Sequence, residues 1–260
     1  MKSLRHFGLT FGVAVLLFGV AEKSAQAGSL AASYFALGEG DADVGNNQGI
    51  GSVSTVIGAG LGPDGLPLVS AAGLADLHDV NATGEIEWWA PAFDTNVSVL
   101  SNPVYPTSIS LPFTDNNMYT NTTVLGANGD DATSFLTAEF RGDFTVAATS
   151  SVDFSACSDD DEFVYLSGGV FGAGTDVVDN GGIHGVSCTS GNENAALLAA
   201  VAPGTYTLSV FYADRERTGA AFQLSSTLDL TPTPDTPEPG TYLLFVSGLT
   251  GLFVARRKRV

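Results

Sequence analysis

Hydrophobic and polar side chains alternate along several segments in the second half of the chain. This period of two is typical of half-buried β-strands, because successive side chains on a strand point to opposite faces. The segments that show it are 135–149, 151–156, 204–214 and 220–230, and in 162–169 the aromatic Phe163 and Tyr165 alternate with the aliphatic Val164 and Leu166. Five or more strands with short turns and few helices predict an all-β fold, an antiparallel β-sandwich.

The first of these segments carries Arg141-Gly142-Asp143 in its middle, and it predicts either two strands or one bulged strand. Helical periodicity is scarce, and its best candidates are residues 71–78 and 193–200. The first third of the chain is less regular, with turn signals gathered in residues 60–70.

Two adjacent tryptophans, Trp88 and Trp89, lie in this less regular part. Neighbouring residues on a strand point to opposite faces, so we expect one of them in the core. The other is either exposed, where it could stack on a sugar, or packed in the core or at a sheet edge. We favour packing over sugar stacking.

The first 27 residues have the pattern of a secretory signal peptide. A basic start with Lys2 and Arg5 precedes an apolar run over residues 9–21, and a small-x-small cleavage site follows at 25–27. A membrane anchor is the alternative, but the run is shorter than the roughly 20 residues that a spanning helix needs. We therefore expect residues 1–27 to be removed and residues 28–230 to form one domain.

The C-terminal end carries a second targeting pattern. Residues 231–239 are a proline-rich linker, residues 240–255 are uncharged and apolar, and residues 256–260 form a basic tail. The order of these three parts resembles the PEP-CTERM sorting signal, in the residues Pro237, Glu238, Pro239, Arg256 and Arg257. The alternative is a plain C-terminal membrane anchor, with the basic cluster kept in the cytoplasm.

The PEP-CTERM resemblance implies an exosortase-type processing enzyme as a partner. It also implies that a helix over 240–255 anchors the protein transiently in the inner membrane. The protein would then pass from the periplasm to the cell surface or extracellular matrix of a Gram-negative bacterium, and associate with exopolysaccharide or biofilm.

The charge between the two ends is strongly negative. Of ten Lys and Arg, three lie in the signal peptide and four in the tail, so only Arg141, Arg215 and Arg217 belong to residues 28–236. These residues hold 26 of the 28 acidic side chains, a net charge near −23. The charge of this region disfavours nucleic acid and anionic membrane surfaces as partners, because binding them requires clustered cations. Divalent cations are compatible partners.

The chain has two cysteines, Cys157 and Cys188. An even count in an exported protein indicates a disulfide. A pair of free thiols is the alternative, whereas a catalytic cysteine is disfavoured because no neighbouring histidine is placed to lower its pKa.

Three consecutive aspartates, Asp159, Asp160 and Asp161, stand before a predicted strand, and Glu162 follows them. Adjacent carboxylates repel one another, so this segment needs either solvent or a cation. Ca²⁺ fits best, since it takes six to eight oxygen ligands in irregular geometry. A solvated acidic loop is the alternative.

The aspartates begin an ordered series of motifs that resembles the fibro-slime domain family. The matching residues that follow are Asp179, Gly181, Gly182, His184, Phe211, Ala213, Asp214, Arg215, Thr218, Gly219 and Phe222. The resemblance implies a protective-antigen-like β-sandwich. In sugar-binding relatives, two aspartates joined by a cis peptide hold a Ca²⁺ that ligates sugar hydroxyls.

Carried over by position, the resemblance implies a metal site at Asp159, Asp160 and Asp161. Its ligand-binding residues would be Asp159, Asp160, Asp179 and His184. Glu216 stands where the family commonly has histidine, and the segment 162–163 departs from the usual Val-Trp opening of the strand.

Three functions remain open at this point. The leading hypothesis is an exported surface or matrix protein, not an enzyme, that binds extracellular polysaccharide or another glycan through Ca²⁺. The second is a purely structural acidic protein that binds calcium without glycan specificity. The third is a secreted glycan hydrolase with Asp214 and Glu216 as paired carboxylates, although we favour an ion-pair cluster of these residues with Arg215 and Arg217.

Overall fold

The computed structural model describes residues 28–45, 56–101, 105–120, 134–190, 194–226, 228 and 230–232. The predicted signal peptide, residues 233–239 of the linker, the apolar segment 240–255 and the basic tail lie outside the described residues. So do the sorting-signal positions. Within the described part of the chain, no helix is long and apolar enough to span a membrane.

Strands dominate the described residues, as the alternation predicts. They are β1 (Ser29–Gly38), β2 (Ile57–Leu61), β3 (Pro67–Val69), β4 (Val97–Val99), β5 (Ser108–Ser110), β6 (Phe113–Asp115), β7 (Ser134–Val146), β8 (Phe154–Asp159), β9 (Asp161–Ser167), β10 (Thr175–Asn180), β11 (Ser187–Ser190), β12 (Gly204–Ala213), β13 (Ala221–Ser226) and β14 (Leu230–Pro232). The helical elements are short: η2 (Gly73–Ala75), η3 (Gly169–Phe171) and α1 (Ala195–Leu198).

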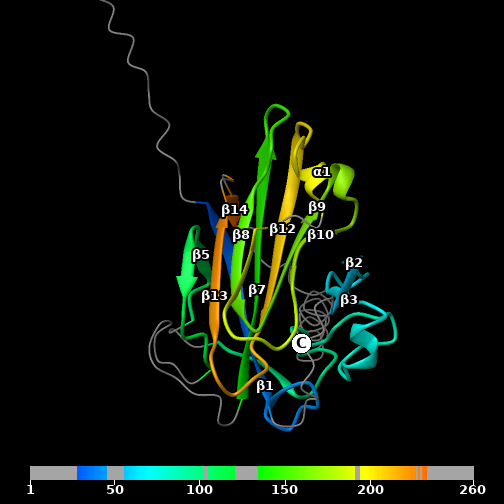
Figure 1. Ribbon diagram of the computed structural model, residues 1–260, viewed down its shortest axis with the longest axis vertical. Helices are drawn as coiled ribbons and strands as arrows, with labels where there is room; N and C mark the ends of the chain where they lie inside the picture. The colour runs from blue at the N-terminus through cyan, green and yellow to red at the C-terminus, as the bar shows by residue number, and fades with distance from the viewer. Residues whose placement is uncertain are drawn as a thin grey trace, which may run out of the picture.

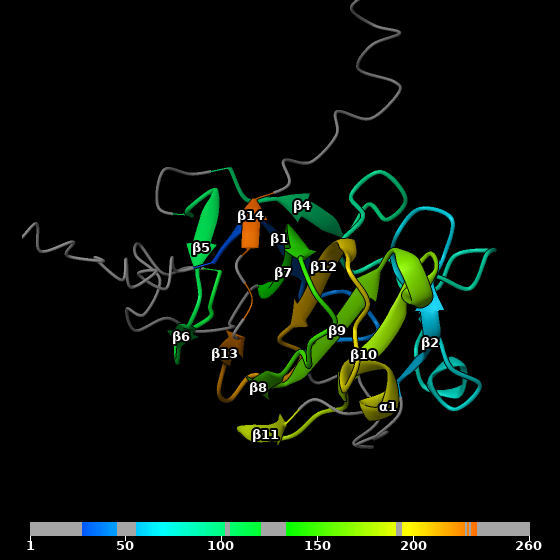
Figure 2. The same ribbon diagram turned by 90° about the horizontal axis from the view of Figure 1, so that it is seen from above.

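The strands form two packed sheets, which Figure 1 shows from the side and Figure 2 from above. The larger sheet has the order β10-β9-β12-β7-β1-β4, with β14 pairing β7 and β5 pairing β1. The smaller sheet has the order β11-β8-β13-β6, and β2 and β3 form a separate pair. All these pairings are antiparallel, which confirms the predicted antiparallel β-sandwich.

The hydrophobic core lies between the two sheets. Phe140 of β7 stacks on Phe222 of β13 with 4.9 Å between ring centroids, and so joins the larger sheet to the smaller one. Val164 of β9 and Val210 of β12 point into the same cluster. Burying large apolar side chains from both inner faces is the main favourable contribution to such a fold.

A second hydrophobic cluster covers the outer face of the larger sheet. Phe163 and Tyr165 alternate with Val164 along β9, so they pack on the outer face together with Phe211. The loops of the first third of the chain cover them. The central strands are therefore buried on both faces, which explains why the segment after Asp161 is apolar at nearly every position.

Several predicted elements differ in detail from the structure. In place of two strands or a bulged strand, segment 135–149 contains one continuous strand, β7, which ends at Val146 and pairs with β12 from Thr137 to Val146. The strand expected at 151–156 begins at Phe154 and extends to Asp159, because the pairing of β8 with β11 and β13 continues through Ser158.

The helix predicted over residues 71–78 is wrong: only the three-residue η2 forms there. Beyond it, the backbone amides of His78 and Asp79 donate to the carboxylate of Asp43 instead of to helical carbonyls. Of the helix predicted over 193–200, only the four-residue α1 forms within residues 194–200.

The expectation that Trp88 and Trp89 lie on a strand, pointing to opposite faces, is also wrong. Both occupy a turn, and both are buried. The indole Nε1 of Trp88 donates to Asp43 Oδ2 at 3.0 Å, and that of Trp89 donates to the Tyr212 carbonyl at 2.8 Å. Neither ring is free to stack on a sugar, so the packing that we favoured for the second tryptophan is confirmed.

Candidate metal centre

The three consecutive aspartates lie where the chain crosses from one sheet to the other. Asp159 ends β8 in the smaller sheet, and Asp161 begins β9 in the larger one. The peptide bond between Asp159 and Asp160 is cis, as the family resemblance implies. Their exposed fractions are 6%, 0% and 0%, so the segment is not a solvated acidic loop.

Asp160 joins three segments of the chain. Its Oδ1 accepts a hydrogen bond from the backbone N–H of His184 at 2.9 Å. Its Oδ2 accepts from the N–H groups of Arg215 and Glu216 at 2.9 and 2.8 Å. Burial and the neighbouring Asp161 raise the pKa of Asp160 to about 7, against the lowering effect of the amides and of Arg215.

Asp161 makes a buried ion pair with Arg215. The Nε of Arg215 donates to Asp161 Oδ2 at 2.6 Å, and the backbone N–H of Gly182 donates to Asp161 Oδ1 at 2.6 Å. The guanidinium lies 4.9 Å from the ring centroid of Trp88 and is 5% exposed. Burial lowers the pKa of Arg215, but the Asp161, Asp160 and Asp43 carboxylates raise it more. These contacts favour a structural role for Asp161, and its metal role stays a prediction.

Asp159 is the aspartate nearest to solvent, and polar side chains of two loops surround it. Burial raises the pKa of its carboxyl, His184 lowers it and Glu216 raises it. His184 and Glu216 are each half-buried. Gly219 adopts φ +96° there, and a Cβ at this position would lie 2.3 Å from Asp159 Oδ2, so only glycine leaves room for the carboxylate.

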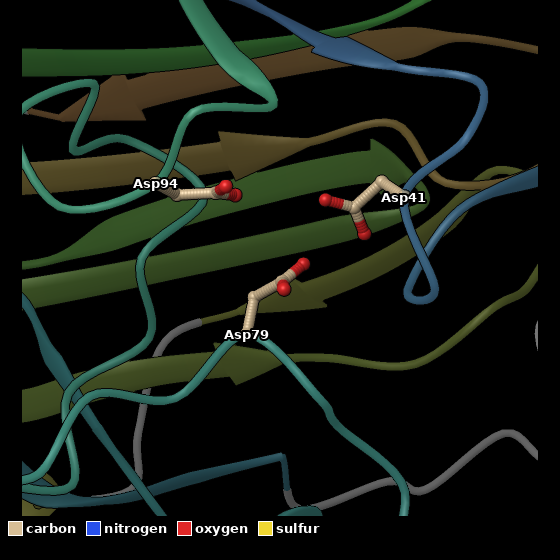
Figure 3. Close-up of side chains that lie close together, drawn as sticks. All are labelled: Asp41, Asp79 and Asp94. Atoms are coloured by element: carbon tan, nitrogen blue, oxygen red, sulfur yellow. The ribbon is translucent and has the colours of Figure 1, made fainter.

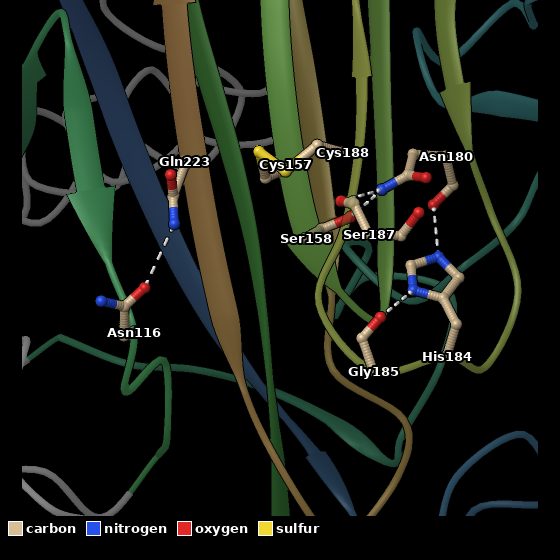
Figure 4. The surroundings of a disulfide bond; sticks show 9 residues. All are labelled: Asn116, Cys157, Ser158, Asn180, His184, Gly185, Ser187, Cys188 and Gln223. Atoms are coloured by element: carbon tan, nitrogen blue, oxygen red, sulfur yellow. Dashed lines mark hydrogen bonds between the residues drawn. A yellow bond between two sulfur atoms is a disulfide. The ribbon is translucent and has the colours of Figure 1, made fainter.

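The loop that carries His184 is held beside the aspartates by a disulfide and by Asn180 (Figure 4). Cys157 and Cys188 are bonded, which confirms the predicted pairing. The side-chain amide of Asn180 donates to Ser158 Oγ at 2.7 Å and to the Ser187 carbonyl at 3.1 Å. The ring nitrogens Nδ1 and Nε2 of His184 lie 3.0 and 3.3 Å from the carbonyl oxygens of Gly185 and Asn180, so the imidazole packs against the backbone of its own loop.

Two further predictions concern Asp179 and the pair Asp214 and Glu216. Asp179 pairs across the sheet with Phe163 and accepts a hydrogen bond from Gly181 N–H at 3.1 Å, so it closes a turn on the outer face of the larger sheet. Its ligand-binding role stays a prediction. We favoured an ion-pair cluster of Asp214 and Glu216 with Arg215 and Arg217, but the ion pairs found are those of Arg215 with Asp161 and of Arg217 with Glu39.

Glu162 follows the aspartates and is completely buried, at 0% exposed. Within the described residues, neither of its carboxylate oxygens has a hydrogen-bond partner. Burial raises the pKa of this carboxyl well above its ordinary value of 4.5. Burial therefore favours the protonated form of Glu162, which follows the candidate ligands in the sequence but is not one of them.

Replacing Glu162 with glutamine is expected to raise the free energy of unfolding relative to wild type, by an amount that grows as the pH rises. In the unfolded chain the Glu162 carboxyl ionises near its ordinary pKa, whereas in the folded protein its pKa is raised. The stability that wild-type Glu162 contributes is therefore fully present below the unfolded pKa and is lost as the pH rises through the folded pKa. The variant does not titrate at this position. The measurement is urea unfolding of both proteins between about pH 5 and about pH 8. A difference in the free energy of unfolding that does not change with pH would contradict a raised pKa.

A second group of carboxylates was missed in the sequence. Asp41, Asp79 and Asp94 lie together on the outer side of the larger sheet, and their nearest carboxylate oxygens are all within 4.8 Å of one another (Figure 3). Burial, together with the neighbouring Asp41, Asp43 and Asp94, raises the pKa of Asp79 to about 9. The only signal in the sequence was the spacing of Asp41 and Asp43 in an irregular segment.

Comparison with known families identifies one motif. Residues 235–259 match the PEP-CTERM protein-sorting motif, which confirms the sorting signal predicted from Pro237, Glu238, Pro239, Arg256 and Arg257. The motif indicates an exported protein that is sorted to the cell surface. No curated protein matches the chain. The resemblance to the fibro-slime family stays a prediction.

Three solved structures show distant likenesses. The PA14 domain of the MpAFP antifreeze protein is 14% identical over 43% of this chain and 58% of its own, with a TM-score of 0.27. This chain thus covers less than two thirds of that structure. The PA14 sugar-binding domain from an RTX adhesin is 12% identical over 79% of this chain and 95% of its own, with a TM-score of 0.31. A chain in the structure of infectious bursal disease virus Gx strain is 12% identical over 85% of this chain and 52% of its own, with a TM-score of 0.19.

Proposed function

We propose that this protein is a non-enzymatic component of the cell surface or extracellular matrix. Its β-sandwich would bind a glycan through a Ca²⁺ ion held by Asp159 and Asp160. The sorting motif supports the location. The observation that carries the binding role is the meeting of three loops at two adjacent carboxylates, one of them fixed and the other near solvent.

The residues present fit a calcium ion. Ca²⁺ prefers carboxylate and carbonyl oxygens, and the side chains of Asp159, Asp160 and Glu216 supply carboxylates at this end of the sandwich. Asp160 Oδ1 accepts one N–H, so one of its lone pairs remains for a cation. Burial raises the pKa of both Asp159 and Asp160, so holding their negative charges here is costly, and a bound cation would offset that cost.

A glycan is the ligand that suits such an ion. A Ca²⁺ bound by two or three carboxylates at the end of a sandwich keeps free coordination positions, since it takes six to eight oxygens. Neighbouring sugar hydroxyls are neutral oxygen ligands that can fill these positions. The strongly negative domain repels anionic chains unless a divalent cation lies between them.

Replacing both Asp159 and Asp160 with asparagine is expected to abolish calcium-dependent binding of polysaccharide. Wild-type protein should be retained on immobilised exopolysaccharide in Ca²⁺ and released by EDTA, and the double variant should not be retained. Calorimetric titration should show loss of a site with Kd in the roughly micromolar to millimolar range.

The matched control is Asp153→Asn, which removes an exposed carboxylate just before β8. It should bind like wild type. Calcium binding without retention on any glycan would favour the purely structural alternative. Equal calcium affinity in the double variant and in wild type would exclude Asp159 and Asp160 as the site.

A further inference from the structure

The three carboxylates of Asp41, Asp79 and Asp94 come from loops far apart in the sequence. Asp41 follows β1, Asp79 lies in the segment after η2, and Asp94 lies in the turn before β4. Figure 3 shows their side chains pointing toward one another from three sides. The cluster is separate from Asp159 and Asp160, and nothing in the proposed function uses it.

One oxygen of each carboxylate lacks a hydrogen-bond donor within the described residues. Asp41 Oδ1 accepts from the N–H of Asp43 at 2.8 Å, and Asp94 Oδ1 accepts from the N–H of Asn96 at 2.8 Å. The Oδ2 atoms of Asp41, Asp79 and Asp94 are buried and have no such partner. Asp41 is only 1% exposed, so its unpartnered oxygen points into the cluster away from water. A buried, unpaired carboxylate is costly, so the arrangement calls for a positive ligand.

The carboxylate of the neighbouring Asp43, unlike those of the cluster, accepts hydrogen bonds at both of its oxygens. Its oxygens accept hydrogen bonds from the amides of His78 and Asp79 and from the indole of Trp88. Asp43 thereby positions the backbone of Asp79 at the cluster. The lack of donors at the three Oδ2 atoms is thus a local feature, not a general shortage of donors in these loops.

Within the described part of the chain, every arginine pairs with a carboxylate outside the cluster. Residues 28–232 contain no lysine and only three arginines. Arg215 pairs with Asp161, Arg141 with Glu139 and Arg217 with Glu39. His78, the nearest histidine on these loops, contacts Asp43. The charge must therefore be balanced by protons or by a bound ion.

We propose that Asp41, Asp79 and Asp94 form a second divalent-cation site, selective for Ca²⁺. Ca²⁺–oxygen distances of about 2.3–2.6 Å place ligands on opposite sides of the ion about 5 Å apart. Carboxylate oxygens up to 4.8 Å apart can therefore all contact one calcium ion. Mg²⁺ fits less well, because it demands shorter bonds in near-ideal octahedral geometry.

The ion would fasten the irregular first third of the chain to the outer face of the larger sheet. The three loops surround the second hydrophobic cluster, in which Trp88 and Trp89 are the largest side chains. These loops have few strand hydrogen bonds of their own. A cation shared by all three replaces the missing regular structure, and binding to the folded state alone stabilises it.

The test compares Asp79→Asn with wild type in EDTA and in Ca²⁺, following thermal unfolding by the near-UV circular dichroism of the two tryptophans. Wild type should gain a higher Tm in Ca²⁺, and Mg²⁺ at the same concentration should give a smaller gain. Asp79→Asn should be at least as stable as wild type in EDTA, because the neutral amide needs neither a proton nor a cation to balance it beside Asp41 and Asp94. It should lose most of the calcium gain, and its Kd for this site should weaken about tenfold or more because affinity follows ligand charge.

The matched control is Asp76→Asn, which removes an exposed carboxylate from the same loop. It should behave like wild type in both conditions. The effect of Asp79→Asn should persist in the Asp159→Asn/Asp160→Asn background, which separates this site from the proposed glycan site. Equal calcium gains in Asp79→Asn and Asp76→Asn would overturn the proposal. A variant less stable than wild type in EDTA would also overturn it, since Asp79 would then be a structural hydrogen-bond acceptor.

Discussion

Replacing Arg215 with methionine is expected to lower the free energy of unfolding by about 3–5 kcal/mol. The guanidinium is buried, pairs with Asp161 at 2.6 Å and lies in the field of Asp160 and Asp43. Methionine keeps much of the side-chain volume but leaves the buried carboxylates without their cation. Removing one partner of a buried ion pair is costly for this reason, even where the intact pair contributes little. Urea unfolding of both proteins measures the difference.

Arg141→Met is the matched control for this prediction. Arg141 also pairs with a carboxylate, that of Glu139, but its side chain is 29% exposed. Its loss should change the free energy of unfolding by no more than about 1 kcal/mol. Arg215→Lys, which keeps the charge without the planar donor geometry, should lie between the two. Equal effects of Arg215→Met and Arg141→Met would mean that the buried pair has no special weight.

Replacing both cysteines with alanine is expected to lower the free energy of unfolding by about 3–4 kcal/mol. Cys157 and Cys188 are separated by 31 residues, and closing a loop of this length restricts the unfolded chain. The same bond joins β8 to β11 and anchors the loop whose His184 amide contacts Asp160. The double variant should therefore also bind calcium more weakly at Asp159 and Asp160.

Reduction of the wild-type protein by dithiothreitol provides the control, and it should reproduce the loss of stability. A variant with wild-type stability would show that the bond adds nothing to the pairing of β8 with β11. A loss of stability without any change in calcium affinity would separate the disulfide from the site.

The strands could be predicted from sequence because their signal is local. Buried and less buried side chains alternate along β13 and the first half of β12, whereas β9 is an apolar run buried on both faces, and the turns between these strands contain glycine and proline. The disulfide was predicted from cysteine count and export, and the sorting signal from three short motifs in order. None of these depends on where distant parts of the chain meet.

The predicted helices failed for a tertiary reason. Residues 71–78 have the composition of a short helix, but the carboxylate of Asp43, more than thirty positions away, takes the amides of His78 and Asp79. The tryptophan pair failed in the same way, because the loops fold back over the outer face and bury both rings. Weak local preference is readily overridden by such long-range contacts.

The sequence by itself determined the sandwich class, the C-terminal sorting motif and the excess of acid, and it singled out Asp159, Asp160 and Asp161. Only the tertiary structure decided what each acidic residue does, because charge balance depends on neighbours in space. Asp161 forms an ion pair with Arg215, and Asp43 accepts hydrogen bonds from backbone amides and an indole. The carboxyl of Glu162 is buried without a hydrogen-bond partner among the described residues. Asp41, Asp79 and Asp94 look like ordinary loop residues in the sequence, and they meet only because three loops close over the same face of the larger sheet.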